Sequence, residues 1–186
     1  MEKETPYLAV KVLYDKKDFI AGAQLANTYL VDDPDSIELQ MLLGQGYLSL
    51  GLHEKALLSL KHAYNNVLHS DPLLPELYYM LGCAYSEQGD MDRAINNLKM
   101  SESLNPTDAT VLRQLGFELF WDGDEETGLE KLKQANEQKA KDPDILGDLA
   151  VCSANAGYKE EAVQYANEAI DAGNDNMRVF LKKLTR

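Results

Sequence analysis

The residue types that most often carry chemistry are few in this chain and are widely spaced. Its three histidines are His53, His62 and His69, and its two cysteines are Cys83 and Cys152. His62 and His69 are seven residues apart and can share a helix face, but no cysteine or carboxylate completes a set at metal-ligand spacing. No arrangement of serine, histidine and acid for nucleophilic catalysis stands out either. We therefore expect no catalytic residue, no cofactor and no metal site.

Two short motifs resemble ligand-binding loops, but each lacks an essential part. GQGYLS at 44–49 begins like a dinucleotide-binding glycine motif, yet it ends in Ser49 and no strand precedes it. WDGDEE at 121–126 is acidic but lacks the alternating oxygen ligands and the distal glutamate of a calcium loop. Gly44 is better explained by close packing of two helices, and the acids by the dipole of a helix that starts there.

Length and composition limit the class of protein. The 186 residues are 45% hydrophobic, which is enough for one domain with a substantial core, and strand-type alternation is too scarce for a sheet. The first residues, MEKETPY, form no secretory signal, and no uncharged run of about 18 residues could span a bilayer. Because the two cysteines fall in different helical segments, we expect free buried thiols and a cytoplasmic protein.

The charge balance excludes two classes of partner. The net charge is −13, from 18 basic and 31 acidic residues, and it repels phosphate backbones and anionic lipid surfaces. We therefore expect neither nucleic acid nor a membrane as partner. Solubility explains the acidic surface, and attraction of a basic partner is the alternative.

Residues 75–108 contain the pattern that organises the chain. One stripe of a first helix has residues at i, i+3, i+4 and i+7, namely Tyr78, Leu81, Gly82 and Tyr85. A turn signal follows at Gly89-Asp90, Ala94 and Leu98 then face back from a second helix, and Pro106 ends the pair. A single helical hairpin cannot bury this stripe, so we expect similar neighbours on both sides.

This pattern resembles the tetratricopeptide repeat, a helix–turn–helix of about 34 residues. Matching residues recur in five segments, at about 3–36, 37–74, 75–108, 109–142 and 143–176. The step into the third segment is four residues longer than the others, and we expect these residues to extend the second helix of the preceding repeat to about 52–70. The resemblance implies an all-α solenoid, a right-handed superhelix in a single domain of residues 1–186. A capping helix at 177–186 is expected from the spacing of Met177, Phe180, Leu181 and Leu184.

The resemblance also implies a binding surface. In this family the first helices line a concave face, onto which the second, fifth, ninth, twelfth and thirteenth residues of each repeat point. At these places we expect a peptide-binding groove of Tyr7, Lys11, Tyr14, Met41, Gln45, Leu48, Tyr79, Arg113, Phe117, Phe120 and Trp121. The fourth repeat is its expected centre, because Phe117, Phe120 and Trp121 form a second apolar stripe on one helix. Lys11 and Arg113 are the expected contacts to carboxylate or carbonyl groups. The alternative is that the three aromatic residues pack between adjacent helices.

We therefore expect a protein-interaction module, a scaffold or co-chaperone-like adaptor that binds a peptide or helix of a partner protein and has no catalysis of its own. The clamp that holds chaperone tails in some members of the family uses lysine, asparagine and arginine. The matching places here hold Met41, Gln45, Met80, Thr110 and Gln114, which departs from that clamp. Two alternatives stay open, namely a homo-oligomeric scaffold whose groove is filled by a second copy, and the interaction subunit of a larger enzyme or regulatory complex. The repeat itself does not encode the partner's identity.

Overall fold

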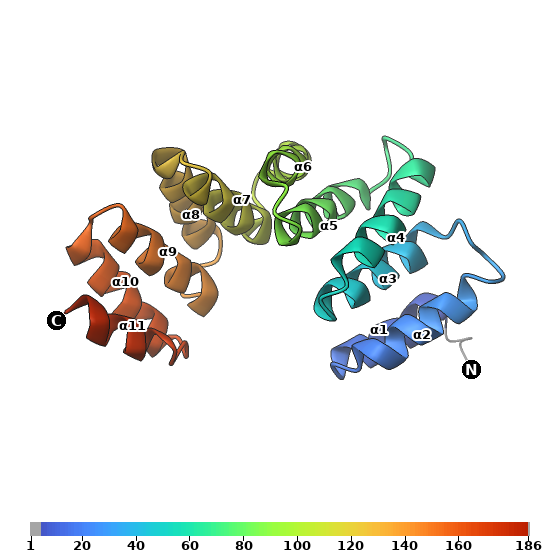
Figure 1. Ribbon diagram of the computed structural model, residues 1–186, viewed down its shortest axis with the longest axis horizontal. Coiled ribbons are helices and arrows are strands. Elements are labelled where there is room, and N and C mark those ends of the chain that lie inside the picture. The colour runs from blue at the N-terminus through green and yellow to red at the C-terminus, as the bar shows by residue number, and fades with distance from the viewer. Residues whose placement is uncertain (1–4, 186) are drawn as a thin grey trace. The chain divides into compact units, whose positions relative to one another are not determined.

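The fold is all-α, as the sequence predicts. A computed structural model describes residues 5–185, and over that range the chain forms eleven helices and no strand (Figure 1). Residues 3–4 of the first expected repeat and residue 186 of the expected cap lie outside the described part. The helices are α1 (Pro6–Asp15), α2 (Phe19–Tyr29), α3 (Ile37–Ser49), α4 (His53–Asn66), α5 (Leu74–Glu87), α6 (Met91–Leu104), α7 (Ala109–Trp121), α8 (Glu125–Gln138), α9 (Pro143–Asn155), α10 (Lys159–Asp171) and α11 (Met177–Leu184).

The chain divides into two compact units. Unit 1 is residues 1–101 and unit 2 is residues 102–186. In unit 1, α1 packs on α2 and α3, and α3 packs on α4 and α5. In unit 2, α7 packs on α8 and α9, and α9 packs on α10. Each unit thus buries its apolar stripes between successive helical hairpins. The organisation as one domain stays a prediction.

Every hairpin turn contains one residue with a left-handed backbone. Gly51, Gly89, Gly123 and Gly157 have φ angles of 69°, 77°, 105° and 86°, and Lys17 holds the same place in the first hairpin with φ 61°. Glycine adopts this conformation without strain because it has no Cβ. The common backbone conformation explains why all five hairpins reverse at the same point.

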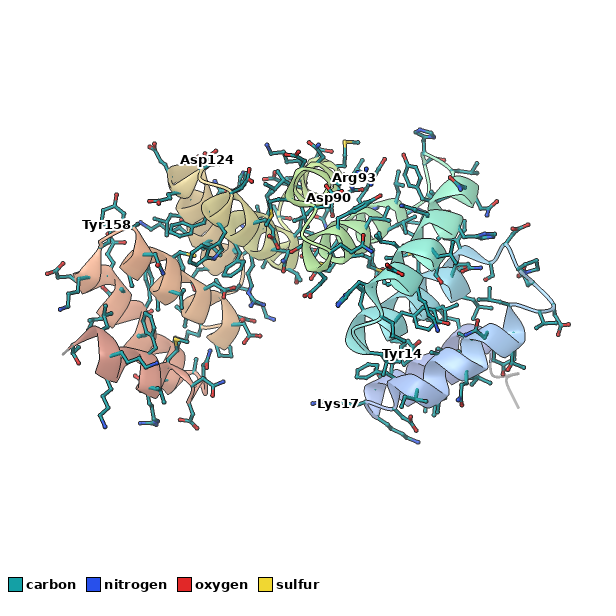
Figure 2. All side chains as sticks on the ribbon, viewed as in Figure 1. Tyr14, Lys17, Asp90, Arg93, Asp124 and Tyr158 are labelled. Atoms are coloured by element: carbon teal, nitrogen blue, oxygen red, sulfur yellow. The ribbon has the colours of Figure 1, made fainter. Side chains whose placement is uncertain are left out.

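Aspartates cap the second helices directly after these turns. The carboxylates of Asp18, Asp90 and Asp124 each accept a hydrogen bond from a backbone N–H three residues further on, at 3.1, 3.3 and 3.3 Å. Such a bond satisfies one of the N–H groups that a helix start leaves without a partner. Figure 2 labels Asp90 and Asp124, and also Tyr158, which occupies the same place before α10 and makes no side-chain cap.

Small residues let the two helices of a pair touch. A Cβ added to Gly82 would lie 2.7 Å from Cγ of Leu98, and one added to Gly116 would lie 2.8 Å from the carbonyl oxygen of Gly128. Ala94 is completely buried. Gly82, Gly116 and Ala94 therefore lie at close helix–helix contacts.

The expected extension of α4 is wrong. The helix ends at Asn66, and Val67 is extended with φ −74° and ψ 140°. The backbone N–H of Asp71 donates to the carbonyl of Leu68, and its carboxylate accepts from the N–H of Leu73, both at 2.9 Å. Because Pro72 disfavours a helical conformation at the residue before it, the additional residues lengthen a loop and not the helix.

A terminal helix is present at the expected place. α11 packs on α10, and the side-chain amide of Asn174 donates to the carbonyl oxygen of Pro143 at 3.1 Å. None of the described helices is both long enough and apolar enough to cross a membrane.

Candidate functional site

The first helices of unit 1 surround a pocket of about 440 Å³. We call it the unit 1 pocket, and it is lined by Tyr7, Lys11, Tyr14, Asp15, Lys17, Phe19, Glu38, Met41, Leu42, Gln45, Ser49, Leu73, Glu76 and Met80. These side chains come from α1 and the turn after it, from the first residue of α2, from α3, and from α5 with the residue before it. The structure thus brings together five residues of the predicted groove, which are Tyr7, Lys11, Tyr14, Met41 and Gln45. Pockets of this volume accommodate small ligands or single side chains of a peptide.

The floor of the pocket is apolar and adaptable. Met41 and Met80 are 5% and 7% exposed, and Leu42 is 7% exposed. Methionine has three rotatable bonds and a polarisable sulfur, so it adjusts its shape to different partners. The floor therefore offers burial to an apolar side chain without fixing its type.

Tyr14 is fixed in the wall of the pocket by two glycines. A Cβ at Gly22 of α2 would overlap the Tyr14 ring, and a Cβ at Gly46 of α3 would overlap its hydroxyl. The hydroxyl is buried and has no hydrogen-bond partner in the described part of the chain. Burial raises the pKa of Tyr14 to about 12, with a further contribution from Tyr47, so the side chain is neutral near pH 7.

The roles of Gly22 and Gly46 were missed by the sequence analysis. Gly22 stands where the third repeat has Ala94, and Gly46 lies beside the packing glycine Gly44. The available signal was a large aromatic at Tyr14 opposite a glycine where alanine is usual. Shape complementarity of this kind becomes visible only when the helices are placed.

Charges are unevenly distributed along the pocket. Glu38 and Glu76 lie in the first turns of α3 and α5, and both are exposed. At the other end of the helices lie Asp15, the last residue of α1, and Lys17 in the turn that follows it. Figure 2 labels Lys17 at this turn.

A larger open hollow adjoins the acidic end. We call it the acidic hollow; its volume is about 820 Å³, and it shares Tyr7, Glu38 and Leu73 with the unit 1 pocket. It adds Asp32 and Asp33, and no lysine or arginine is among the described residues that line it. One side of the site therefore carries several carboxylates and an exposed tyrosine ring.

Two other predicted groove residues of unit 1 lie outside both hollows. Leu48 and Tyr79 are half-buried and pack against the core cluster that contains Met41 and Leu77. Lys11 lines the unit 1 pocket, and its Nζ lies 5.8 Å from the centre of the Tyr7 ring. That distance is within the range of a cation–π interaction.

The fourth repeat, in unit 2, differs from its expected role. Phe120 is only 4% exposed and belongs to a core cluster with Leu112, so the expectation of an anchor on the surface is corrected. Its place explains this burial, because Leu112, Gly116 and Phe120 follow at i, i+4 and i+8 on the packing stripe. Trp121 is 49% exposed, and its ring packs edge-on against Phe120 and Phe117 at 5.4 and 6.1 Å.

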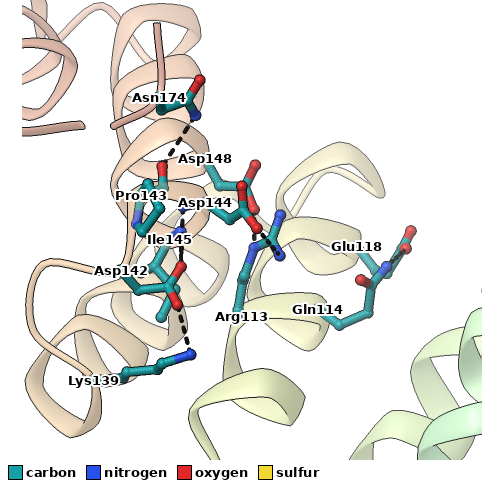
Figure 3. Close-up of polar contacts among 10 residues, drawn as sticks. All are labelled: Arg113, Gln114, Glu118, Lys139, Asp142, Pro143, Asp144, Ile145, Asp148 and Asn174. Carbon is teal, nitrogen blue, oxygen red and sulfur yellow. Dashed lines mark hydrogen bonds and ion pairs between the residues drawn. The ribbon is translucent and has the colours of Figure 1, made fainter. Parts of the chain in front are cut away.

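Arg113 binds carboxylates of its own chain (Figure 3). Its Nε donates to Oδ2 of Asp148 at 2.5 Å, and its Nη1 lies 3.8 Å from Oδ2 of Asp144. Burial alone would lower the pKa of Arg113, but Asp148, with smaller contributions from Asp144 and Asp142, outweighs that effect and raises it. Burial raises the pKa of the Asp148 carboxyl, and Arg113 opposes this shift. The expected contact to a partner's carboxylate is therefore corrected to a bridge between α7 and α9.

The residue types that could do chemistry do not converge on one site in the described part of the chain. No three histidine, cysteine or acidic side chains within residues 5–185 are placed to hold a metal ion. Nε2 of His62 contacts Asp35 at 3.0 Å, and Nε2 of His53 lies 4.0 Å from Glu87. Cys152 is completely buried, and burial raises the pKa of its thiol to about 12, with Asp148 adding to the shift.

Comparisons with known proteins agree with this architecture. Residues 75–108 match the family model described as tetratricopeptide repeat. Among curated proteins, no sequence matches the chain significantly.

Solved structures share the fold over nearly the whole chain. A thermophilic TPR protein of Thermus thermophilus is 24% identical, with a TM-score of 0.79 over 97% of each chain. MamA is 24% identical, with a TM-score of 0.71 over 91% of this chain and 96% of its own. YrrB, described as a TPR protein with an unusual peptide-binding site, is 21% identical, with a TM-score of 0.70 over 98% of this chain and 93% of its own. At these identities the likeness concerns the fold.

Proposed function

We propose that the chain is a non-catalytic adaptor that binds a peptide or helix of another protein in the unit 1 pocket. The basis is that it carries a tetratricopeptide repeat and has the fold of tetratricopeptide-repeat proteins. The fold is that of a protein-interaction repeat module. The peptide-binding site described for YrrB, which shares this fold, supports the proposal.

One observation carries the proposal. Five side chains that the repeat pattern assigns to the concave face line the same pocket, and its floor is formed by the buried methionines Met41 and Met80. An apolar side chain that fills such a floor gains about 1.5 to 3 kcal/mol from its burial. The exposed rim, with Tyr7 and Gln45, can then select the partner by shape and hydrogen bonding.

Blocking the pocket tests the proposal. Gln45 lines the pocket and is exposed, so Gln45→Trp should fill the pocket without disturbing the core. Proteins captured by the full chain are identified, and the affinity of each purified candidate is then measured by calorimetry. We expect Gln45→Trp to lower the affinity for the true partner by about tenfold or more, as for the loss of a binding hot spot.

The matched control is Gln24→Trp. Gln24 is exposed on α2 and does not line the unit 1 pocket. This control should bind like the wild type. Equal affinity of Gln45→Trp and Gln24→Trp would show that the partner binds elsewhere, and the exposed Trp121 in unit 2 would be the next surface to test.

A further inference from the structure

We propose that the unit 1 pocket selects a partner segment with a lysine or arginine beside an apolar side chain. This inference rests on the proposed function, because it names the chemistry of the partner for the same pocket. It follows from the arrangement of charge and apolar surface along α1, α3 and α5.

The cation would bind at the acidic end of the pocket. Glu38 and Glu76 line the pocket from the first turns of two neighbouring helices. Among residues 5–185, no lysine, arginine or histidine forms an ion pair with either carboxylate. Two carboxylates on one pocket repel each other, and a cation placed between them removes that repulsion.

The acidic hollow extends the same field. Asp32 and Asp33 line it together with Glu38, and none of the described residues that line it is basic. Tyr7 borders both hollows and is 38% exposed. Nζ of Lys11 already lies 5.8 Å from the centre of this ring, so a partner's cation reaches the ring only by displacing Lys11 or from the opposite face. A guanidinium or ammonium group is thus recognised mainly by the carboxylates.

The two lysines of the pocket do not reverse this preference. Lys11 already lies over the Tyr7 ring at 5.8 Å, and Lys17 lies at the other end, where Asp15 also lines the pocket. The whole chain has a net charge of −13, so its long-range field also attracts cations. Lys17 instead gives the pocket a polarity, because it lies at the end away from Glu38 and Glu76 and orients a bound segment with its cation towards the starts of α3 and α5.

The apolar neighbour of the cation would occupy the floor. Met41 and Met80 lie on α3 and α5, two helices that contact each other. Glu38 is three residues before Met41, and Glu76 is four residues before Met80. Each acid is therefore about one helical turn from a methionine on the same face. A basic and an apolar side chain close together on one segment match this spacing.

Three labelled peptides test the inference with the full chain. Each has nine residues in which leucine alternates with lysine, with glutamate or with glutamine, and binding is followed by fluorescence anisotropy. We expect the lysine peptide to bind about fivefold to tenfold more tightly than the glutamine peptide, as two partly exposed charge contacts allow. We also expect this preference to decline as salt is raised.

Variants that remove or reverse the charges of Glu38 and Glu76 test whether these carboxylates bind the cation. The double variant Glu38→Gln and Glu76→Gln should lose the preference for lysine, and Glu38→Lys with Glu76→Lys should transfer it to the glutamate peptide. The control is Glu126→Gln with Glu160→Gln, which removes two exposed first-turn glutamates from α8 and α10. It changes the net charge by the same amount and should keep the preference.

Other outcomes separate this inference from the proposed function. If the glutamate or glutamine peptide binds as tightly as the lysine peptide and Gln45→Trp abolishes binding, the pocket is a binding site but its selectivity is not for a cation. Suppose that Glu38→Gln with Glu76→Gln and the control Glu126→Gln with Glu160→Gln reduce the affinity for the lysine peptide equally. The attraction to the acidic chain would then be unspecific, and the inference would be overturned. Binding of none of the three peptides would count against the pocket itself.

Discussion

At the scale of single residues, Tyr14 is the least conventional feature of the core. Its ring replaces the side chains that Gly22 and Gly46 lack, and its hydroxyl is buried without a partner in the described chain. A buried hydroxyl that makes no hydrogen bond costs about 1 to 3 kcal/mol. The volume of the ring is therefore useful to the fold, and its oxygen is not.

Removing the oxygen should stabilise the protein. We expect Tyr14→Phe to raise the free energy of unfolding by about 1 kcal/mol in a urea titration. Gly46→Ala should lower it by about 1 to 3 kcal/mol in the wild type, because the new methyl group meets the hydroxyl. The same substitution should cost less in the Tyr14→Phe background. A loss of stability in Tyr14→Phe would mean that the hydroxyl has a hydrogen-bond partner in solution.

The cap of α9 should make stability depend on pH. Burial alone would raise the pKa of Asp142, but bonds from Lys139 and from the N–H groups of Ile145 and Asp144 outweigh it and lower the pKa below its ordinary value of 3.8. The carboxylate's contribution is therefore present above that value and is lost as the pH falls through the lower folded-state pKa.

Asp142→Asn isolates this effect, because asparagine keeps the acceptor oxygen. Near neutral pH the variant should be only slightly less stable than the wild type, since Lys139 is exposed and the ion pair is screened. Unfolding measured from about pH 7 to about pH 2 should show this difference shrinking only at the acidic end. A constant difference would contradict the role of the charge. Asp142→Ala, which also removes the cap itself, should cost about 1 kcal/mol more than Asp142→Asn at every pH.

At the scale of helices and turns, the first hairpin has one strained residue. Lys17 has φ 61° at the place where the other four hairpins have glycine. A residue with a Cβ in this conformation costs about 1 to 2 kcal/mol. Replacing it with glycine removes this strain, but part of the gain is lost because glycine makes the unfolded chain more flexible. Lys17→Gly should therefore stabilise the protein by about 0.5 to 1 kcal/mol in thermal unfolding. Lys17→Ala is the control and should give no gain, since alanine keeps the Cβ.

Helix α7 presents a buried and an exposed aromatic side by side. Phe120 is 4% exposed and Trp121 is 49% exposed. Phe120→Ala should lower the free energy of unfolding by about 3 to 5 kcal/mol, as expected for a large cavity in a core. Trp121→Ala should cost clearly less, and chemical denaturation can compare the two. If both cost the same, Trp121 has a structural role and is not available to a partner.

At the scale of the whole molecule, charge decides between an adaptor and a self-associating scaffold. The net charge of −13 makes copies repel each other. We expect sedimentation velocity to show a monomer that is independent of concentration at low salt. If a dimer forms and Gln45→Trp dissociates it while Gln24→Trp does not, a second copy occupies the pocket and the homo-oligomeric alternative holds.

Much of the architecture could be predicted because the repeat is encoded locally. The stripe of Tyr78, Leu81 and Tyr85 requires a helix, and Gly89 marks its end, whatever lies further along the chain. The end of α4 is mispredicted because Val67 and Leu68 continue the helical spacing of apolar residues. The turn at Asp71 depends on hydrogen bonds, which the spacing of apolar residues does not reveal.

The site was harder to predict, because the offset within a repeat does not determine burial. Tyr14, Leu48 and Phe120 occupy the same place in their repeats, and Tyr14 and Phe120 are 7% and 4% exposed whereas Leu48 is half-buried. This place lies at the border between the concave face and the core, so the local fit of the neighbouring helix decides. Glu38 and Glu76 also fall at concave places, but their joint position in one pocket appears only in three dimensions.

The loop between α4 and α5 makes the protein divisible. Its residues Leu68, His69 and Ser70 are exposed, and the two helices that it joins, α4 and α5, pack directly on each other. Exposed loop tips are the preferred sites of proteolytic nicking and of tolerated insertions. A chain cut at this loop should therefore stay together as two fragments joined by the α4–α5 contact. The same place would accept the break of a split reporter whose halves reassemble without a covalent link.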